Sequence, residues 1–139
     1  MEQAAELSRA FIAAFNRRDG DAMWALLHPN VHYQVGAGQA TSFSGIPAVQ
    51  TYYTNSLASD ARAETVSITV SGDIVFAENR ITGTLPDGRS YSIEQAVRHC
   101  WQDGLLIEYR NYNDPPLVEG EPVTLEQFMT IMTGASKTE

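Results

Sequence analysis

The chain has 139 residues, 43% of them hydrophobic, which fits one globular domain with a core of its own. Its formal net charge is −8, and its longest basic run is Arg17–Arg18, so binding to nucleic acid or to an anionic membrane is disfavoured, because both need clustered cations. The single cysteine, Cys100, excludes an intrachain disulfide and a cysteine-rich metal site.

Targeting and cofactor signals are missing from the sequence. The N-terminal MEQAAELSRA has no apolar stretch typical of a secretory signal, and no apolar run approaches the roughly 20 residues of a membrane span. The 3 histidines are scattered without metal-ligand spacing, and GAGQAT lacks the context of a phosphate-binding loop. We therefore expect a cytoplasmic protein that uses no metal or other cofactor.

The first half of the sequence is typical of helices. Apolar residues at helical spacing, among them Phe11, predict a first helix, and Pro29 ends the second. Asp21 is placed to cap that second helix, and Pro47 falls in the first turn of the third, where proline is tolerated. We expect helices over 3–19, 22–28 and 46–58, a strand over 30–35 and a loop over 36–45.

From Ala63 onward the sequence is typical of strands joined by tight turns. The turns are SGD, PDG and QDG, which are hairpin-like. We expect strands over 63–72, 73–85, 88–102 and 105–113, and a closing helix over 124–132 that is capped by Thr124. Helices followed by an antiparallel meander predict an α+β fold, with residues 1–139 as a single domain.

Two stretches of the sequence carry a resemblance to a known superfamily. FIAAFNRRDGDAMWALLHPNVHYQV, followed by SGIPAVQTYYTNSL, resembles the opening half of the ketosteroid-isomerase-like, or nuclear transport factor 2-like, superfamily. ITGTLPDGRSYSI, followed by DGLLIEYRNYNDPPLV, is similar to limonene epoxide hydrolases and SnoaL-like polyketide cyclases. The resemblance implies a cone-shaped, curved, mostly antiparallel sheet packed on three N-terminal helices, enclosing one pocket.

The resemblance argues against the best-known activity of the superfamily. Ketosteroid isomerases need a Tyr and two Asp in the pocket. The resemblance places these three roles at Phe11, Val35 and Val97. None of these side chains can donate a hydrogen bond or carry a proton. We therefore expect them to line the pocket, and we expect no standard ketosteroid isomerase activity.

The epoxide hydrolases offer a second comparison. Their Asp–Arg–Asp relay is matched by Glu78 and Arg80, in reversed order, and by Asn111, which cannot accept a proton. Glu78 and Arg80 are two residues apart on one strand and so share a face. The resemblance implies Glu78 as general base, Arg80 and Asn111 as its partners and Tyr33 as a hydroxyl donor. The alternative for the charged pair is a strand-edge ion pair.

Strand alternation gives an independent expectation for the pocket. On the last two long strands the odd-numbered residues form the more apolar face, which should point toward the helices. The expected pocket residues on these strands are Ile93, Gln95, Val97, His99, Asn111 and Asn113. His99 is a candidate proton shuttle or a hydrogen-bonded core histidine. Tyr53 and Leu57 on the third helix are expected as pocket walls.

These expectations favour a cofactor-independent acid–base enzyme that acts on a hydrophobic small molecule, of the isomerase, cyclase, dehydratase or epoxide-hydrolase type. The alternative is a binding or assembly module of the same fold without catalysis. Members of the superfamily often pair through the outer face of the sheet, so we also expect a homodimer.

Overall fold

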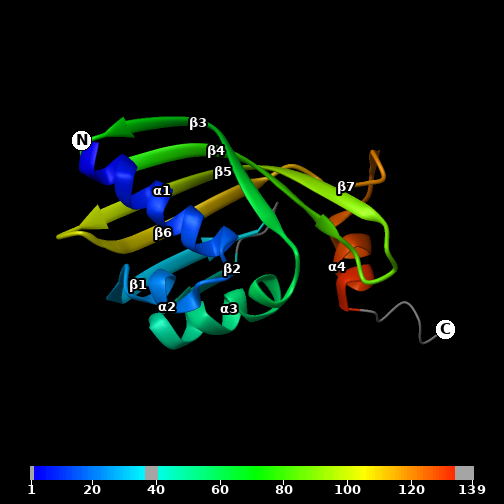
Figure 1. The fold of residues 1–139 in the computed structure, drawn as a ribbon, viewed down its shortest axis with the longest axis horizontal. Helices are drawn as coiled ribbons and strands as arrows, with labels where there is room; N and C mark the ends of the chain where they lie inside the picture. Colours follow the sequence, from blue (N-terminus) through cyan, green and yellow to red (C-terminus); the bar gives the residue numbers. More distant parts are fainter. Residues whose placement is uncertain (1, 37–40, 134–139) are drawn as a thin grey trace.

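The computed structural model describes residues 2–36 and 41–133, in which helices come first and a long meander of strands follows (Figure 1). The elements in chain order are α1 (Glu2–Asn16), α2 (Gly20–Trp24), β1 (Leu27–Val35), β2 (Thr41–Ser44), α3 (Ile46–Ala58), β3 (Arg62–Ser71), β4 (Ile74–Thr84), β5 (Ser90–Gln102), β6 (Leu105–Asn113), β7 (Leu117–Val118), β8 (Glu121–Pro122) and α4 (Leu125–Thr133).

One curved sheet runs through the whole molecule in the order β2-β1-β6-β5-β4-β3. The pairing of β1 with β6 is parallel, and the other pairings are antiparallel. The sheet bends around α1, which packs on β3 and β4, while α3 packs on β1 (Figure 1). This confirms the expected α+β fold. No helix in the described ranges is long and apolar enough to cross a membrane.

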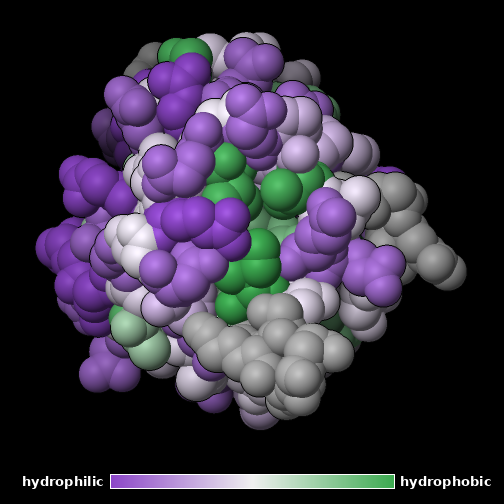
Figure 2. Space-filling view, turned by 90° about the vertical axis from the view of Figure 1, so that its right-hand side faces the viewer, coloured by the Kyte–Doolittle hydropathy of each residue, from purple (hydrophilic) through white to green (hydrophobic). Residues whose placement is uncertain are grey.

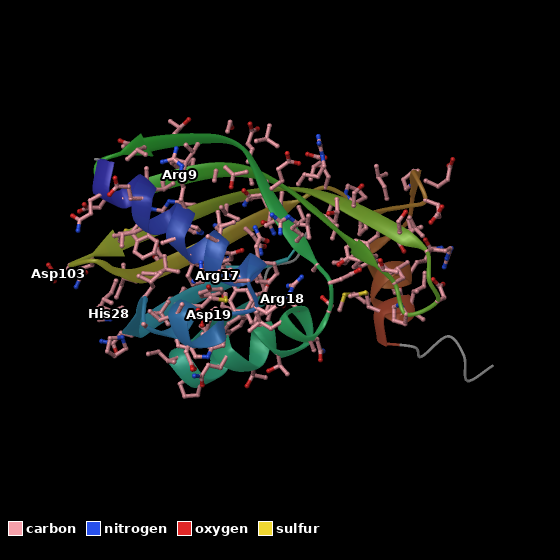
Figure 3. The ribbon with its side chains drawn as sticks, in the orientation of Figure 1. Arg9, Arg17, Arg18, Asp19, His28 and Asp103 are labelled. Carbon is pink, nitrogen blue, oxygen red and sulfur yellow. The ribbon has the colours of Figure 1, made fainter. Side chains whose placement is uncertain are left out.

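Helix α1 buries one face against the sheet and ends in a polar corner. Phe11 and Ala14 are 3% and 1% exposed, as their helical spacing predicts. Arg18, with a φ of 63°, follows the helix (Figure 3). Its guanidinium donates to the carbonyl oxygens of Ser56, in the last turn of α3, and of Ala61, directly before β3. A cation at the exposed carbonyls of a helix end is favourable, so this corner joins α1 to α3.

The second helix differs from the prediction at both ends. Its cap is Asp19, whose side chain accepts from the Ala22 backbone at 3.1 Å, so the assignment of Asp21 as the cap was wrong. The helix ends at Trp24, because the chain then joins the sheet: the Leu106 backbone donates to the carbonyl of Leu26 at 2.7 Å. Pairing between distant segments thus overrides the local helical pattern.

The expected loop over 36–45 contains a strand in its described part. Residues of β2 pair antiparallel with β1, with His32 opposite Ser44 and Tyr33 opposite Phe43. Residues 37–40 lie outside the described residues. The third helix occupies 46–58 as predicted, with Gly45 before it at a φ of 93° and Pro47 in its first turn. Glycine adopts this left-handed conformation without the steric cost other residues incur.

The C-terminal segment closes the far end of the sheet. β7 pairs with the start of β5, with Val118 opposite Tyr91, and α4 follows (Figure 1). Phe128 of α4 packs on Tyr91, with ring centres 5.1 Å apart, inside a second apolar cluster. Thr124 caps α4 as predicted, through reciprocal hydrogen bonds with Gln127 of 2.9 and 3.0 Å.

Candidate functional site

A cavity of about 890 Å³ lies between the helices and the concave face of the sheet. Its walls come from α1, α3, α4 and the inward positions of β4, β5 and β6. Met129 of α4 lines it while 50% exposed, so the cavity reaches the surface beside α4. Viewed from that end, hydrophobic side chains lie in a hollow surrounded by hydrophilic residues (Figure 2). This size and lining suit a small organic ligand.

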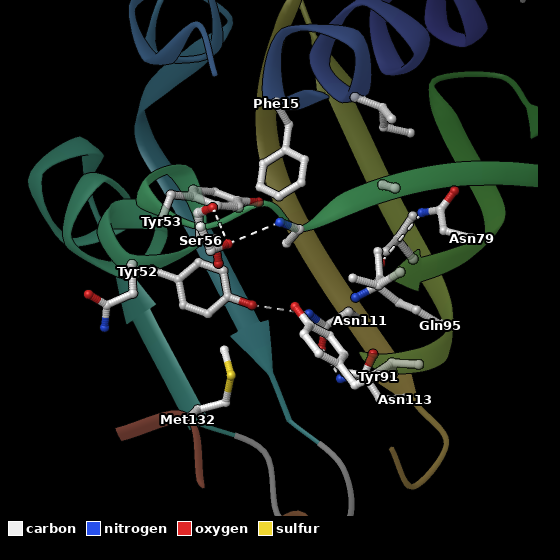
Figure 4. A pocket seen from close by; sticks show the side chains of 18 of the residues that line it. Phe15, Tyr52, Tyr53, Ser56, Asn79, Tyr91, Gln95, Asn111, Asn113 and Met132 are labelled. Carbon is white, nitrogen blue, oxygen red and sulfur yellow. Dashed lines mark hydrogen bonds between the residues drawn. The ribbon is translucent and has the colours of Figure 1, made fainter. Parts of the chain in front are cut away.

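Four amide side chains form a polar strip across the sheet wall of the cavity (Figure 4). They are Asn79 on β4, Gln95 on β5, and Asn111 and Asn113 on β6. Asn79 faces Gln95 across β4 and β5, and Gln95 faces Asn113 across β5 and β6. Asn79 and Asn111 are 3% and 4% exposed. Buried amides need hydrogen-bond partners, and Asn79 and Asn111 have them in Thr65 and in the Tyr52 and Tyr109 hydroxyls, so these two side chains are held in defined orientations.

Tyrosine hydroxyls continue this strip toward α3. The Tyr33 and Tyr53 hydroxyls are 2.9 Å apart, and Tyr33 stacks on Tyr109 with ring centres 4.2 Å apart. The Asn111 Nδ2 donates to the Tyr109 and Tyr52 hydroxyls at 3.3 and 3.4 Å (Figure 4). Burial raises the pKa of Tyr109 and of its tyrosine neighbours, so each keeps its proton at neutral pH.

His99 lines the cavity and is 1% exposed. Its Nδ1 lies 2.8 Å from the Ser8 hydroxyl, which accepts a 2.9 Å hydrogen bond from the Trp101 indole N–H. The Ser8 hydroxyl can therefore donate a hydrogen bond to Nδ1, in which case Nε2 is the ring nitrogen that carries the proton. Burial lowers the pKa of His99 to about 4, because desolvation disfavours the charged ring. His99 is thus neutral at physiological pH.

Most residues that were expected to line the pocket do line the cavity. These residues are Phe11, Tyr53, Ile93, Gln95, Val97, His99, Asn111 and Asn113. Tyr33 lies one layer behind the wall, fully buried, and reaches the site through its hydrogen bond with Tyr53. Val35 and Leu57 are not among the lining residues and instead pack, half-buried, against the core. The alternation on β5 and β6 therefore placed all of its expected wall residues correctly, whereas β1 and α3 each contributed one wrong residue.

The charged pair Glu78 and Arg80 lies on the opposite, outer face of the sheet, so Glu78 cannot be the base for a molecule in the cavity. Glu78 is exposed and accepts from the Ser67 hydroxyl at 2.7 Å, and Arg80 pairs with Glu94 at 2.7 Å. On β4 the inward residues are Val75, Ala77 and Asn79. The resemblance thus placed the wrong β4 residues in the pocket. The alternative of a strand-edge ion pair between Glu78 and Arg80 was wrong too, because each side chain bonds to a neighbouring strand and β4 lies inside the sheet.

Sequence reasoning missed several residues of the site. Asn79 continues the inward alternation of β4, so the pattern itself contained the signal for it, and the odd-numbered face expected for the last strand already included Tyr109. Tyr52 shares the cavity with Tyr53, although neighbouring helical positions usually diverge. The α4 side chains Phe128 and Met129 had no such signal, because their place depends on how the C-terminal segment folds back.

Metal-binding and charged groups are not gathered at this cavity. The histidines lie apart: His28 is at the end of the molecule opposite α4 (Figure 3), and His32 bonds with Ser44. No group of three His, Cys, Asp or Glu side chains within the described residues can hold a metal ion. The described residues that line the cavity also include no Asp, Glu, Lys or Arg.

A curved α+β cone that encloses an apolar cavity with a polar strip defines the class of nuclear transport factor 2-like, or ketosteroid-isomerase-like, folds. The chain belongs to the SnoaL-like domain family, which matches residues 8–109. Among curated proteins, none matches the sequence.

Solved structures share the fold at low sequence identity. A nuclear transport factor 2-like protein of unknown function from Burkholderia pseudomallei has a TM-score of 0.76 and 17% identity, over 96% of this chain and 99% of that chain. A provisionally named polyketide cyclase from Xanthomonas campestris has a TM-score of 0.70 and 24% identity, over 94% and 97%. A provisionally named isomerase from Bacillus subtilis has a TM-score of 0.69 and 24% identity, over 82% and 88%.

Proposed function

We propose that the cavity binds a neutral, largely apolar small molecule that carries at least one oxygen- or nitrogen-containing group. The observation that carries this proposal is the chemistry of the wall: amides, tyrosines and a neutral histidine supply its polarity, and none of its described residues is an ionised side chain. An ion enters such a site at a high cost in desolvation, because no opposite charge meets it. A neutral ligand avoids that cost.

The cavity position of Ser56 on α3 allows a direct test. Ser56 is half-buried and lines the cavity, whereas Thr54 on the same helix is exposed and is not a lining residue. A Ser56→Trp variant fills part of the space, and Thr54→Trp adds the same side chain outside it. The neutral dye Nile red should bind the unmodified protein and Thr54→Trp with increased fluorescence, and should bind Ser56→Trp at least about tenfold more weakly. Equal binding by both variants would contradict the proposal.

A second candidate is acid–base catalysis of the isomerase or cyclase type, as in the names of two similar structures. His99 is the observation that favours it, because it is a neutral imidazole in the cavity whose pKa of about 4 is close to that of a carboxylic acid. The Tyr109 hydroxyl accepts from Asn111 Nδ2, so its own proton is oriented to be a donor of the kind that stabilises a developing oxyanion.

Catalysis requires the other tautomer of His99, with the proton on Nδ1 and the Nε2 lone pair toward the substrate. Rotation of the Ser8 hydroxyl allows this change, because its oxygen can accept from both Nδ1 and Trp101. The test is a comparison of proton exchange: the unmodified protein should catalyse deuterium incorporation at the α-carbon of 2-acetonaphthone in D₂O, and His99→Gln should not. Binding of the ketone without exchange would reject catalysis and leave the binding proposal standing.

A further inference from the structure

The orientation of the β6 amides is fixed by a backbone group. The Gly36 backbone N–H, which can only donate, bonds to Asn111 Oδ1 at 3.1 Å. Asn111 Nδ2 therefore points to the tyrosine hydroxyls, and Asn111 Oδ1 is also approached by Asn113 Nδ2 at 3.5 Å. This order assigns the oxygen and nitrogen of both amides without ambiguity.

With the amides in this orientation, the side-chain oxygen of Asn113 is left as a hydrogen-bond acceptor without a donor. Asn113 Oδ1 is buried and has no hydrogen-bond partner among the described residues. A buried carbonyl oxygen without a partner is costly, and a native structure leaves few such atoms. Because Asn113 lines the cavity, a bound molecule can supply the missing donor.

Gln95 provides the matching donor on the neighbouring strand. The Thr65 hydroxyl bonds to Asn79 Oδ1 at 2.9 Å, and Asn79 Nδ2 then lies 3.5 Å from Gln95 Oε1. Gln95 Nε2 is left without a partner among the described residues, and Gln95 is directly opposite Asn113 in the β5–β6 pairing. Directly opposite residues have Cβ atoms about 5 Å apart, so both side chains can contact one polar group of a bound ligand. Figure 4 shows the two side chains on the wall of the cavity.

We propose that Gln95 and Asn113 recognise a ligand group that both accepts and donates a hydrogen bond: a hydroxyl, a primary carboxamide or a lactam. Gln95 Nε2 donates to the oxygen of this group, and its O–H or N–H donates to Asn113 Oδ1. Esters, ethers and ketones satisfy Gln95 alone. This inference rests on the proposed function, since it names the chemistry that the neutral ligand must carry.

The test uses two matched pairs of probes and isothermal titration calorimetry. The pairs are 2-naphthamide with methyl 2-naphthoate, and 2-naphthalenemethanol with its methyl ether. At least one donor-bearing probe should bind about tenfold more tightly than its capped partner, because the cap leaves Asn113 Oδ1 unpaired. The pair that shows the preference distinguishes an amide ligand from an alcohol.

Two variants locate the preference. Asn113→Leu removes the acceptor and Gln95→Met removes the donor, each at similar side-chain volume, so one remains informative if the other fails to fold. Either should abolish the preference, whereas Gln50→Met, at a position of α3 that does not line the cavity, should retain it. Binding of all four probes without preference would overturn this inference and leave the proposed function intact. Binding of none would overturn both.

Discussion

At the scale of single residues, the surroundings of His99 keep its imidazole ring neutral. Ser8 from α1 bonds to its Nδ1, and the rings of Phe11 and Tyr109 lie against it at centre distances of 6.0 and 5.4 Å. Desolvation is the cause of its lowered pKa. The protonation state of this one histidine in the cavity wall therefore affects the free energy of unfolding.

The first prediction is a loss of stability at acidic pH. The ordinary histidine pKa of about 6.5 applies to the unfolded chain, and the folded value is about 4. As pH falls from 6.5 to 4 the unfolded chain takes up a proton that the folded protein does not, so the free energy of unfolding decreases by about 3 kcal/mol. Above pH 6.5 this contribution is constant.

The measurement is urea unfolding at several pH values for the unmodified protein and for His99→Gln. Groups other than His99 titrate in both proteins, so the difference between the two curves isolates this residue. The slope of the unmodified protein between pH 6.5 and 4 should be the steeper. Parallel curves would mean that His99 is not buried in its neutral form.

The second prediction concerns Ser8, which serves both Trp101 and His99. Ser8→Ala leaves the indole N–H and the imidazole Nδ1 without their common partner, so we expect the free energy of unfolding to fall by about 1–3 kcal/mol. Ser44→Ala is the matched control, because Ser44 is exposed and makes a 2.8 Å contact with the half-buried His32. The control should change stability by less than about 0.5 kcal/mol in urea unfolding. An equal effect of both substitutions would refute the role given to Ser8.

At the scale of elements, the Tyr91 side chain of β5 lies over Gly83 of β4, beside the second apolar cluster. Gly83 is opposite Tyr91 in the β4–β5 pairing, and a Cβ on Gly83 would lie 2.6 Å from the Tyr91 hydroxyl. Tyr91 in turn packs on Phe128, so this glycine allows α4 to dock. A side chain at position 83 would displace the tyrosine ring from the strand.

The third prediction follows from that contact. Gly83→Ala should reduce the free energy of unfolding by about 1–3 kcal/mol, because the added methyl group forces Tyr91 off its packing position. The neighbouring exposed Thr82 gives the control Thr82→Ala, which should be nearly neutral. Unfolding followed by tryptophan fluorescence measures both. A neutral or stabilising Gly83→Ala would show that Tyr91 moves aside freely.

The sequence pattern correctly predicted those elements whose ends are determined by residues next to them in the sequence. The third helix was placed correctly, because Gly45 and Pro47 mark its start within the sequence itself. The end of α2 was placed incorrectly, because it depends on a hydrogen bond from the Leu106 backbone, about eighty residues away along the chain. In the site, alternation placed His99 and Asn111 on the wall, whereas the α4 side chains depend on long-range packing that no local pattern encodes.

At the scale of the whole molecule, the outer face of the sheet holds apolar side chains that the chain itself does not cover. Val66, Phe76 and Tyr112 are 57%, 48% and 48% exposed, and Arg110 lies over the Tyr112 ring at 4.7 Å. Exposed large apolar side chains on a sheet face are typical of an interface, and Phe76 and Tyr112 lie on the outer face of β4 and β6. We propose that two copies associate through this face, with the same surface on both.

The fourth prediction is therefore a homodimer in solution. Light scattering after gel filtration should give twice the 15.3 kDa mass of the chain. Tyr112→Glu should shift the mass toward the monomer, because it places a charge within the interface. Thr51→Glu, on an exposed position of α3, should leave it unchanged. A monomeric unmodified protein would contradict this proposal.

The neutral chemistry of the cavity is the central claim, and one comparison tests it most directly. Isothermal titration calorimetry at pH 7 would measure the binding of 2-naphthamide and of 2-naphthoate, which have nearly the same shape but differ in charge. We predict that the neutral amide binds at least about a hundredfold more tightly, because no described cavity residue offers a cation to the carboxylate. Equal or tighter binding of 2-naphthoate would contradict the account.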